Sequence, residues 1–308
     1  MKTDRPIAVI VGSGGQDGQL LAENLQGIGY EVVGLRRDTI NIANSTEVAK
    51  FISGLHPREV YFLAAHHHSS EEASGGEGAL FHESFNVNAS AVANFLNAIA
   101  VHSPSSRFFY ASSCLIFPPA ENGKQAEATV PRPESAYAIS KAAGMLVCQY
   151  YRNAKGVFAS SGILYNHESP LRGARFLSKK IVSAAVRIAR DGYGSLVLGN
   201  LASKVDWGYA PDYVDAMRRI LQLSSPADYV VATGEAHTVR EFAEIAFSSV
   251  GLDYQEYVST KPELLARQNH LRIGDAARLR ADTGWSPSIS FEEMVQRLVE
   301  EEKRIVDE

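Results

Sequence analysis

Short apolar runs alternate with amphipathic stretches through the first half of the chain. The apolar runs predict β-strands at residues 7–11, 30–35, 60–64 and 107–111. The amphipathic stretches between them predict helices at residues 19–27 and 88–101. Strands that alternate with helices of this length indicate βαβ units, and therefore an α/β fold built on a doubly wound parallel sheet.

The second half of the chain is less regular. After about Ser169 the pattern predicts helices at residues 178–190, 212–223 and 239–250, and a charged helical tail from Ser290. We expect residues 1–168 to form the domain with the parallel sheet. Residues 169–308 should form mainly a smaller C-terminal cap whose residues intermix with the first domain.

The composition is that of a globular chain, because 45% hydrophobic and 21% charged residues exclude the fibrous and disordered classes. A net charge of −5 gives no reason to expect nucleic acid or an anionic membrane surface. No apolar run approaches the ~18 residues that span a bilayer, and the first residues lack the pattern of a signal peptide. The two cysteines, Cys114 and Cys148, cannot form a disulfide framework. We therefore expect a cytoplasmic protein with no nucleic-acid or membrane partner.

A glycine-rich segment follows the first strand and precedes a helix. Gly12, Gly15 and Gly18 stand three residues apart, with Gln16 and Asp17 between the last two. Glycines at this spacing let the chain turn tightly, approach a pyrophosphate and pack the helix on the sheet. The free N–H groups at the start of that helix would bind the phosphates. A plain tight turn is the alternative, but strand, loop and helix together predict a dinucleotide-binding Rossmann domain.

Arg36 and Arg37 come directly after the second strand, where a Rossmann domain meets the adenosine ribose. A carboxylate at the end of this strand would favour NAD, whereas two guanidinium groups suit a 2′-phosphate. Asp38 follows them, and solvated surface arginines are the alternative. The pair predicts NADP, with NAD less favoured.

Tyr137 and Lys141 stand four residues apart, on one face of a predicted helix. A nearby ammonium group would stabilise a phenolate and lower the tyrosine pKa, which makes the phenol a usable acid or base. Ser112 and Ser113 lie just past the fourth strand, where a hydroxyl could complete the site.

Taken together, these features resemble the extended short-chain dehydrogenase/reductase superfamily (NAD-dependent epimerase/dehydratase), and within it the GDP-mannose 4,6-dehydratase branch. The resemblance covers nearly the whole chain, including residues 131–141, Asn166-His167-Glu168-Ser169-Pro170 and Asp206-Trp207-Gly208. It implies a nucleotide-sugar substrate held between the cofactor domain and the cap.

The resemblance also assigns roles to individual residues. Ser113, Tyr137 and Lys141 take the catalytic positions. Cofactor contacts are implied for Tyr137 and Lys141 as well, and further for Asn41, Leu63, Ala64, Ala65, His68, Leu164, Asn166 and His167. Substrate contacts are implied for Asn166, Lys180, Asn200 and Arg267.

One departure from this branch concerns the chemistry. The dehydratases carry a glutamate two residues after the catalytic Ser/Thr that moves protons during water elimination, and Leu115 stands at that position here. Cys114 is a secondary catalytic candidate, because the Ser-Ser-Cys stretch resembles GDP-fucose synthases, whose cysteine serves epimerisation. A small buried apolar residue is the alternative for Cys114. Phe176 stands near the place of a histidine that those synthases use.

Other departures concern assembly and metal. The dehydratases have a long insertion after the paired arginines that reaches a neighbouring subunit, and this chain lacks it, so we expect a homodimer. Three consecutive histidines, residues 66–68, have no ligand partner at a metal-binding spacing. We expect no metal and assign them a lining role.

Three functions compete. The first is an NADP-dependent oxidoreductase that reduces the C4 ketone of a 4-keto-6-deoxy nucleotide hexose, with a GDP-linked sugar favoured, because Tyr137, Lys141 and a serine suffice for that reaction. The second is a 4,6-dehydratase or epimerase that uses another acid/base, such as Cys114 or Glu168. The third is a non-catalytic cofactor-binding subunit.

Overall fold

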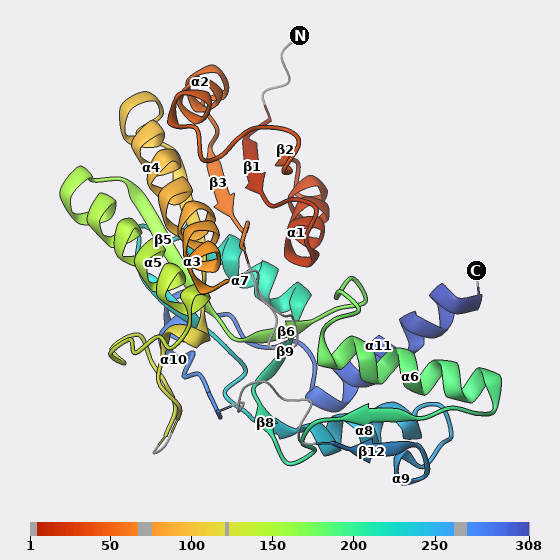
Figure 1. Ribbon diagram of the computed structural model, residues 1–308. Coiled ribbons are helices and arrows are strands. Elements are labelled where there is room, and N and C mark those ends of the chain that lie inside the picture. The colour runs from red at the N-terminus through yellow and green to blue at the C-terminus, as the bar shows by residue number, and fades with distance from the viewer. Residues whose placement is uncertain (1–4, 67–75, 121–122, 262–269, 308) are drawn as a thin grey trace.

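The computed structural model describes residues 5–66, 76–120, 123–261 and 270–307 (Figure 1). Six strands of this described chain form one parallel sheet in the order β10-β5-β4-β3-β1-β2. They are β1 (Ile7–Val11), β2 (Glu31–Leu35), β3 (Glu59–Phe62), β4 (Arg107–Ser113), β5 (Phe158–Leu164) and β10 (Asp228–Val231). The sheet confirms the predicted α/β fold with a doubly wound parallel sheet.

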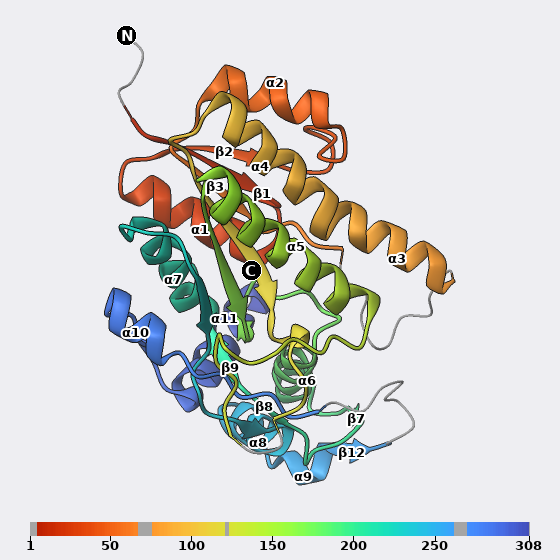
Figure 2. The same ribbon diagram turned by 90° about the vertical axis from the view of Figure 1, so that its left-hand side faces the viewer.

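Helices cover both faces of this sheet. Figure 2 shows α2 (Ser45–Leu55), α4 (Ala91–His102) and α5 (Ala136–Lys155) on one face, with α3 (Glu77–Phe85) leading into α4. On the other face lie α1 (Gln16–Gly27), α7 (Ala210–Gln222) and α10 (Ala277–Thr283). Because both faces are covered, the central strands β1, β3, β4 and β5 are mostly buried, whereas the edge strand β2 is largely accessible.

A second hydrophobic core holds the cap together. It lies among α6 (Leu177–Asp191), α8 (Val239–Ser248), α9 (Tyr254–Tyr257) and α11 (Phe291–Asp307). Short strand pairs surround it: β6 (Asn166–Glu168) with β9 (Trp207–Tyr209), β7 (Leu196–Leu198) with β12 (Val258–Thr260), and β8 (Lys204–Val205) with β11 (His237–Thr238). No helix among the described residues is both long and apolar enough to cross a membrane.

The two cores do not divide the chain at one point. After β6 the chain enters the cap, but α7, β10 and α10 return to the first core. Residues 210–232 and 276–285 therefore belong to the sheet domain, although they follow cap residues in the sequence.

The first strands and the principal helices lie where the hydrophobic pattern predicts them, but some boundaries differ. The helix predicted from Gln19 begins at Gln16, so that Gly18 lies inside α1. The helix predicted from Asn88 is split into a π-helical turn, η1 (Asn86–Ser90), and α4. The pattern did not identify β5 and β10 as strands.

The tight packing of α5 on η1 generates a stability prediction. A Cβ at Gly144 would overlap the carbonyl oxygen of Asn88 and the hydroxyl of Tyr110. Gly144→Ala should therefore lower the free energy of unfolding by about 1–3 kcal/mol, although alanine is the better helix former. Gly54→Ala is the matched control, because a Cβ at that helical glycine meets nothing within 4 Å, and it should stabilise by about 0.4–1 kcal/mol. Chemical denaturation of both variants measures the difference, and equal stabilities would contradict the packing.

Candidate active site

The glycine loop lies where the strand order of the sheet reverses, between β1 and β3. Gly12 has φ +94°, and a Cβ there would lie 2.7 Å from the backbone nitrogen of Ala64. A Cβ at Gly18 would lie 2.5 Å from the carbonyl oxygen of Gly12. Gly15 is the N-cap of α1 and has no side chain, so no N-cap side chain accepts hydrogen bonds from the first N–H groups of the helix. In open α/β sheets, ligands bind at this reversal point, outside the carboxyl ends of the strands.

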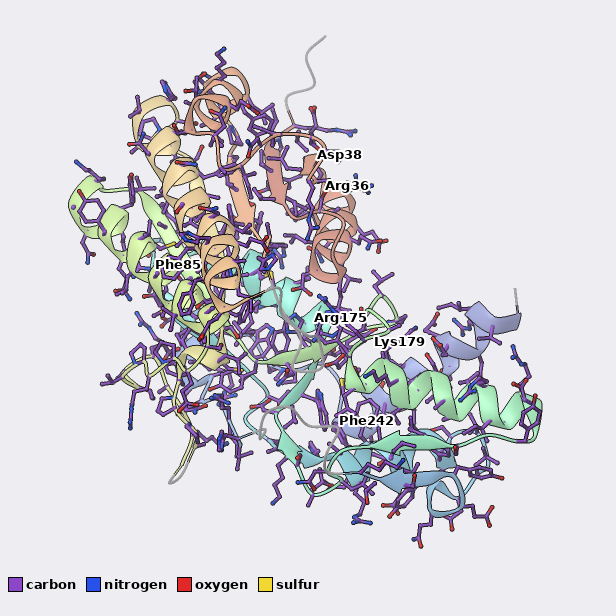
Figure 3. The ribbon with its side chains drawn as sticks, viewed as in Figure 1. Arg36, Asp38, Phe85, Arg175, Lys179 and Phe242 are labelled. Carbon is purple, nitrogen blue, oxygen red and sulfur yellow. The ribbon has the colours of Figure 1, made fainter. Side chains whose placement is uncertain are left out.

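The predicted neighbours of a dinucleotide surround this loop. Leu63, Ala64 and Ala65 follow β3, and the N–H of Leu63 donates to the carbonyl oxygen of Val11 over 2.9 Å. Arg36 follows β2, and its side chain lies beside Gly14 at the mouth of the loop. Arg36 and Asp38 are exposed at this edge of the sheet (Figure 3).

Arg37 and Asn41 are also exposed after β2. The Asn41 side chain accepts a hydrogen bond from the N–H of Ala43 over 3.1 Å, so it shapes the turn that leads to α2. His68 lies outside the described residues. The neighbouring His66 pairs through Nε2 with Glu83, 3.2 Å away.

Ser113, Tyr137 and Lys141 lie together, as the sequence predicts. The Ser135 side chain caps α5 by accepting from the N–H of Ala138, and this starts the helix just before Tyr137. Tyr137 forms a side-chain hydrogen bond with Ser113 at the end of β4. The Lys141 ammonium lies 5.8 Å from the centre of the Tyr137 ring. Leu164, at the end of β5, pairs with Ser113 in the sheet.

Two buried polar residues that the sequence did not single out support the helix that carries Tyr137 and Lys141. Asn88, fully buried on the π-helical turn η1, donates to Ser140 Oγ over 3.0 Å. Ser140 in turn donates to the backbone carbonyl of Tyr137 over 2.8 Å. Asn88 also holds His66 through that residue's backbone N–H. A π-helical turn commonly marks a functional site and is the one local signal here, but hydrophobic periodicity does not reveal it.

The prediction that Lys141 lowers the pKa of Tyr137 is wrong. Burial raises the pKa of Tyr137 well above its ordinary value, and the hydrogen bond with Ser113 offsets this only in part. Lys141 directs its ammonium to the carbonyl oxygen of Ala111, 2.7 Å away, rather than to the phenol. Burial also lowers the pKa of Lys141 to about 7, so it is a weak source of positive charge. Tyr137 therefore keeps its proton at neutral pH and has one to donate, but the raised pKa makes it a weaker acid than an ordinary tyrosine.

Neither Cys114 nor Leu115, the two residues after Ser113, is a ready acid or base. Leu115 is half-buried in the short 3₁₀ turn η2 (Cys114–Ile116), and its N–H donates to Ser113 Oγ over 3.2 Å. Cys114 is buried, and burial raises the pKa of its thiol to about 12. Cys114 is thus a neutral thiol at pH 7, and its catalytic role stays a prediction.

The segment after β5 contacts the glycine loop from the cap side. Gln16 Nε2 donates to the carbonyl oxygen of His167 over 3.2 Å, and Ser169 Oγ donates to Gln16 Oε1 over 2.8 Å. Asp17 faces the imidazole of His167. These contacts bring predicted cofactor residues from the two ends of the domain together.

Arg172, which the sequence did not single out, lies in the same segment and links it to the cap. Its Nε lies 3.1 Å from Glu168, and its guanidinium carbon lies 3.6 Å from the centre of the Phe176 ring. Glu168 also accepts a hydrogen bond from Ser178 Oγ over 2.5 Å. Figure 3 shows Arg175 and Lys179 where this segment enters α6.

The predicted substrate residues are placed as follows. Asn166 is exposed at the start of β6, and Lys180 lies in the first turn of α6. Asn200 is exposed, and its side chain accepts from the N–H of Ala202 over 2.8 Å. Arg267 lies outside the described residues.

Comparison with known proteins decides the family. The family described as GDP-mannose 4,6 dehydratase matches residues 38–298. GDP-mannose 4,6 dehydratase 2 of Arabidopsis thaliana is 36% identical, over 97% of this chain and 87% of its own length. The chain belongs to the GDP-mannose 4,6 dehydratase family. The human GDP-mannose 4,6 dehydratase, another relative of this family, is 30% identical over 97% of this chain and 92% of its own length.

Solved structures show how widely this fold is shared. RMD from Pseudomonas aeruginosa, solved with NADPH, superposes with a TM-score of 0.83 at 20% identity, covering 97% of this chain and 99% of that one. UDP-glucose 4-epimerase of Thermus thermophilus, solved with NAD, gives 0.81 at 22% identity, with the same coverages. The family member described here therefore has the fold of the extended short-chain dehydrogenase/reductase enzymes.

The buried Lys141 generates a pH prediction. Because its folded pKa is about 7 and its ordinary value is 10.5, the unfolded chain binds more protons than the folded one between these values. Lys141 should therefore make the free energy of unfolding rise as the pH increases from 7 to 10. Urea denaturation of the wild type and of Lys141→Met across this range isolates the contribution of the lysine. Parallel profiles for the two proteins would show that the ammonium is not destabilised by burial.

Proposed function

We propose that this protein is an NADP-dependent oxidoreductase that reduces the C4 ketone of a 4-keto-6-deoxy nucleotide hexose, with a GDP-linked sugar favoured. One observation carries the proposal: Tyr137 forms a hydrogen bond with Ser113, while Leu115 stands where the family resemblance expects a proton-transferring glutamate. The site can thus donate a proton to a carbonyl oxygen, but it lacks the usual base for water elimination.

The loop after β1 fits a dinucleotide. Side chains are excluded at Gly12 and Gly18, and the N-terminal N–H groups of α1 are uncapped. Arg36 would contact an adenosine 2′-phosphate, since it lies beside the loop, and Arg37 follows it. We infer NADP rather than NAD from this pair of guanidinium groups.

The protein's own residues would act as follows. When bound, NADPH supplies a hydride to the carbonyl carbon of the sugar. Ser113 donates a hydrogen bond to the carbonyl oxygen and so polarises it. Tyr137 gives its phenolic proton to that oxygen as negative charge develops there. Lys141 donates to the carbonyl oxygen of Ala111, so its part is to hold α5 against the end of β4 beside Tyr137.

A 4,6-dehydratase is the alternative that the names of the relatives favour. It would need a base for the C5 proton, and the sequence offered Cys114 and Glu168 as replacements. The Cys114 thiol is neutral, and Glu168 is buried and engaged by Ser178 and Arg172. Neither is a free base, which supports reduction. A non-catalytic subunit is disfavoured because a pure binder need not retain Ser113, Tyr137 and Lys141 in contact.

The nucleotide sugar would lie between the two cores, since Tyr137 is in the first turn of α5 and Lys180 is in the first turn of the cap helix α6. A GDP-linked sugar is inferred from the names of the curated relatives. The structure describes one chain, so the expected homodimer remains a prediction.

Cofactor preference provides the first test. NADPH should bind more tightly than NADH, and the double variant Arg36→Ala, Arg37→Ala should reduce that preference by about 1–3 kcal/mol, as expected for charge-assisted hydrogen bonds. The fluorescence of the bound nucleotide measures the dissociation constants of NADPH and NADH for each protein. Arg297→Ala with Arg304→Ala removes two arginines from α11 and should leave the preference intact. Equal affinity of the wild type for both nucleotides would refute NADP selectivity.

Reaction type provides the second test. With NADPH and a GDP-4-keto-6-deoxyhexose, mass spectrometry should detect a product with two added hydrogen atoms, whereas GDP-mannose should lose no water. Tyr137→Phe should lower turnover by about 10²–10⁴-fold, because it removes the transferable proton but keeps the ring. Tyr150→Phe changes an exposed tyrosine on the same helix and should have no effect. Efficient water loss from GDP-mannose would overturn the reductase proposal.

A further inference from the structure

Asp17 and His167 form an ion pair between the glycine loop and β6. His167 Nε2 lies 3.0 Å from each carboxylate oxygen of Asp17, and Nδ1 lies 2.7 Å from the carbonyl oxygen of Tyr165. Both ring nitrogens therefore face acceptors. A neutral imidazole has one N–H and can donate to only one of them, whereas an imidazolium donates to both. The contacts thus select the protonated form of His167.

The surroundings of the imidazole support a positive charge. The ring is buried and stacks on Tyr213, with 4.4 Å between ring centres and 20° between planes. Burial lowers the pKa of His167, but the charge and hydrogen bond of Asp17 outweigh this, so the pKa lies above its ordinary value. The positive charge of Arg172 opposes protonation of His167 only in part. Lys141 also interacts with Asp17, at longer range. Glu168 is engaged by Arg172 and Ser178.

Asp17 lies in the first turn of α1, two residues after the Gly15 N-cap. This is the end of the helix that would receive the pyrophosphate. Burial raises the pKa of Asp17, but His167 and Gln16 outweigh this, so the carboxyl stays ionised. An uncompensated carboxylate here would repel an incoming phosphate through a medium that screens charge less than water does. His167 supplies the compensating charge.

We propose that His167 is a positioning residue that neutralises Asp17 and thereby keeps the start of α1 able to accept the phosphates of a dinucleotide. This inference rests on the proposed function. In this proposal His167 promotes binding because its positive charge neutralises the Asp17 carboxylate, and not because His167 contacts the dinucleotide.

Binding of NADPH by four variants distinguishes these explanations. His167→Gln leaves Asp17 uncompensated and should weaken binding about tenfold or more. Asp17→Asn removes the repelling charge and should bind NADPH at least as tightly as the wild type. The double variant Asp17→Asn, His167→Gln joins two neutral amides and should recover affinity to within about threefold of the wild type. His237→Gln, which breaks a histidine–carboxylate pair in the cap, should have no effect.

The pH dependence gives an independent measurement. His167 loses its proton as the pH rises through its raised pKa, so NADPH affinity of the wild type should fall above that value. Lys141 also titrates near pH 7, but it is present in both the wild type and the double variant. The ratio of the NADPH affinity of the wild type to that of the double variant therefore isolates the contribution of Asp17 and His167. This ratio should decline from pH 6.5 to 9.5, and a constant ratio would contradict the proposal.

The outcomes separate this inference from the proposed function. A double variant as weak as His167→Gln would show that His167 acts through a direct contact, and wild-type affinity in His167→Gln would show that it does not matter. Either result overturns the inference and leaves NADPH binding by the wild type intact. Failure of the wild type to bind NADPH or NADH would overturn the proposed function as well. If His167→Gln does not fold, the ¹⁵N chemical shifts of the wild-type imidazole nitrogens provide the test. The signal of His167 is assigned as the one that changes in Asp17→Asn. A neutral His167 imidazole at pH 7 in the wild type would contradict the proposal.

Discussion

The backbones of Gly12 and Ala64 approach each other so closely that no side chain fits between them. This contact lies where the strand order reverses, between β1 and β3, and it determines the path of the glycine loop. The loop in turn places the uncapped start of α1 at the carboxyl edge of the sheet. Asp17, which follows at once, can therefore reach His167 on the far side of the site. A methyl group at position 12 would require the backbone at Gly12 or at Ala64 to shift.

The site concentrates ionisable side chains that are largely withdrawn from water. Lys141 and His167 are both buried, and each is held by a backbone carbonyl oxygen, of Ala111 and Tyr165 respectively. The difference between them is the partner charge: His167 faces a carboxylate, whereas Lys141 has only the more distant Asp17. Burial accordingly lowers the pKa of Lys141, while the ion pair raises that of His167. The site thus makes Lys141 easier to deprotonate, and His167 harder to deprotonate, than each residue is in water.

The parts of the fold that depend on local pattern could be predicted from the sequence. β1 and the spacing of Tyr137 and Lys141 follow from apolar runs and helical periodicity. β5 was not predicted as a strand because its central residues are small and do not form an apolar run. Gly162 is required there, because a side chain at that position would overlap Phe109 on β4. β10 is only four residues long and follows cap residues in the sequence.

The site depended more on contacts that a sequence does not display. Asn88 and Ser140 are 52 residues apart, and no local pattern links them. The interpretation of Lys141 as an ammonium that lowers the pKa of Tyr137 failed because spacing along a helix does not say where the end of a long side chain is anchored.

The return of α7 and β10 to the first core determines how this protein can be divided or recombined. A chain cut after Glu168 would lose β10 and expose the backbone of β5 as a new sheet edge, which is a template for aggregation. It would also lose the helix that packs beside α1 on one face of the sheet. Cap exchange between relatives must therefore replace separate segments and keep residues 210–232 in place. In this architecture the cap is assembled from separate chain segments, α6, α8 and α11 among them, that alternate with segments of the sheet domain.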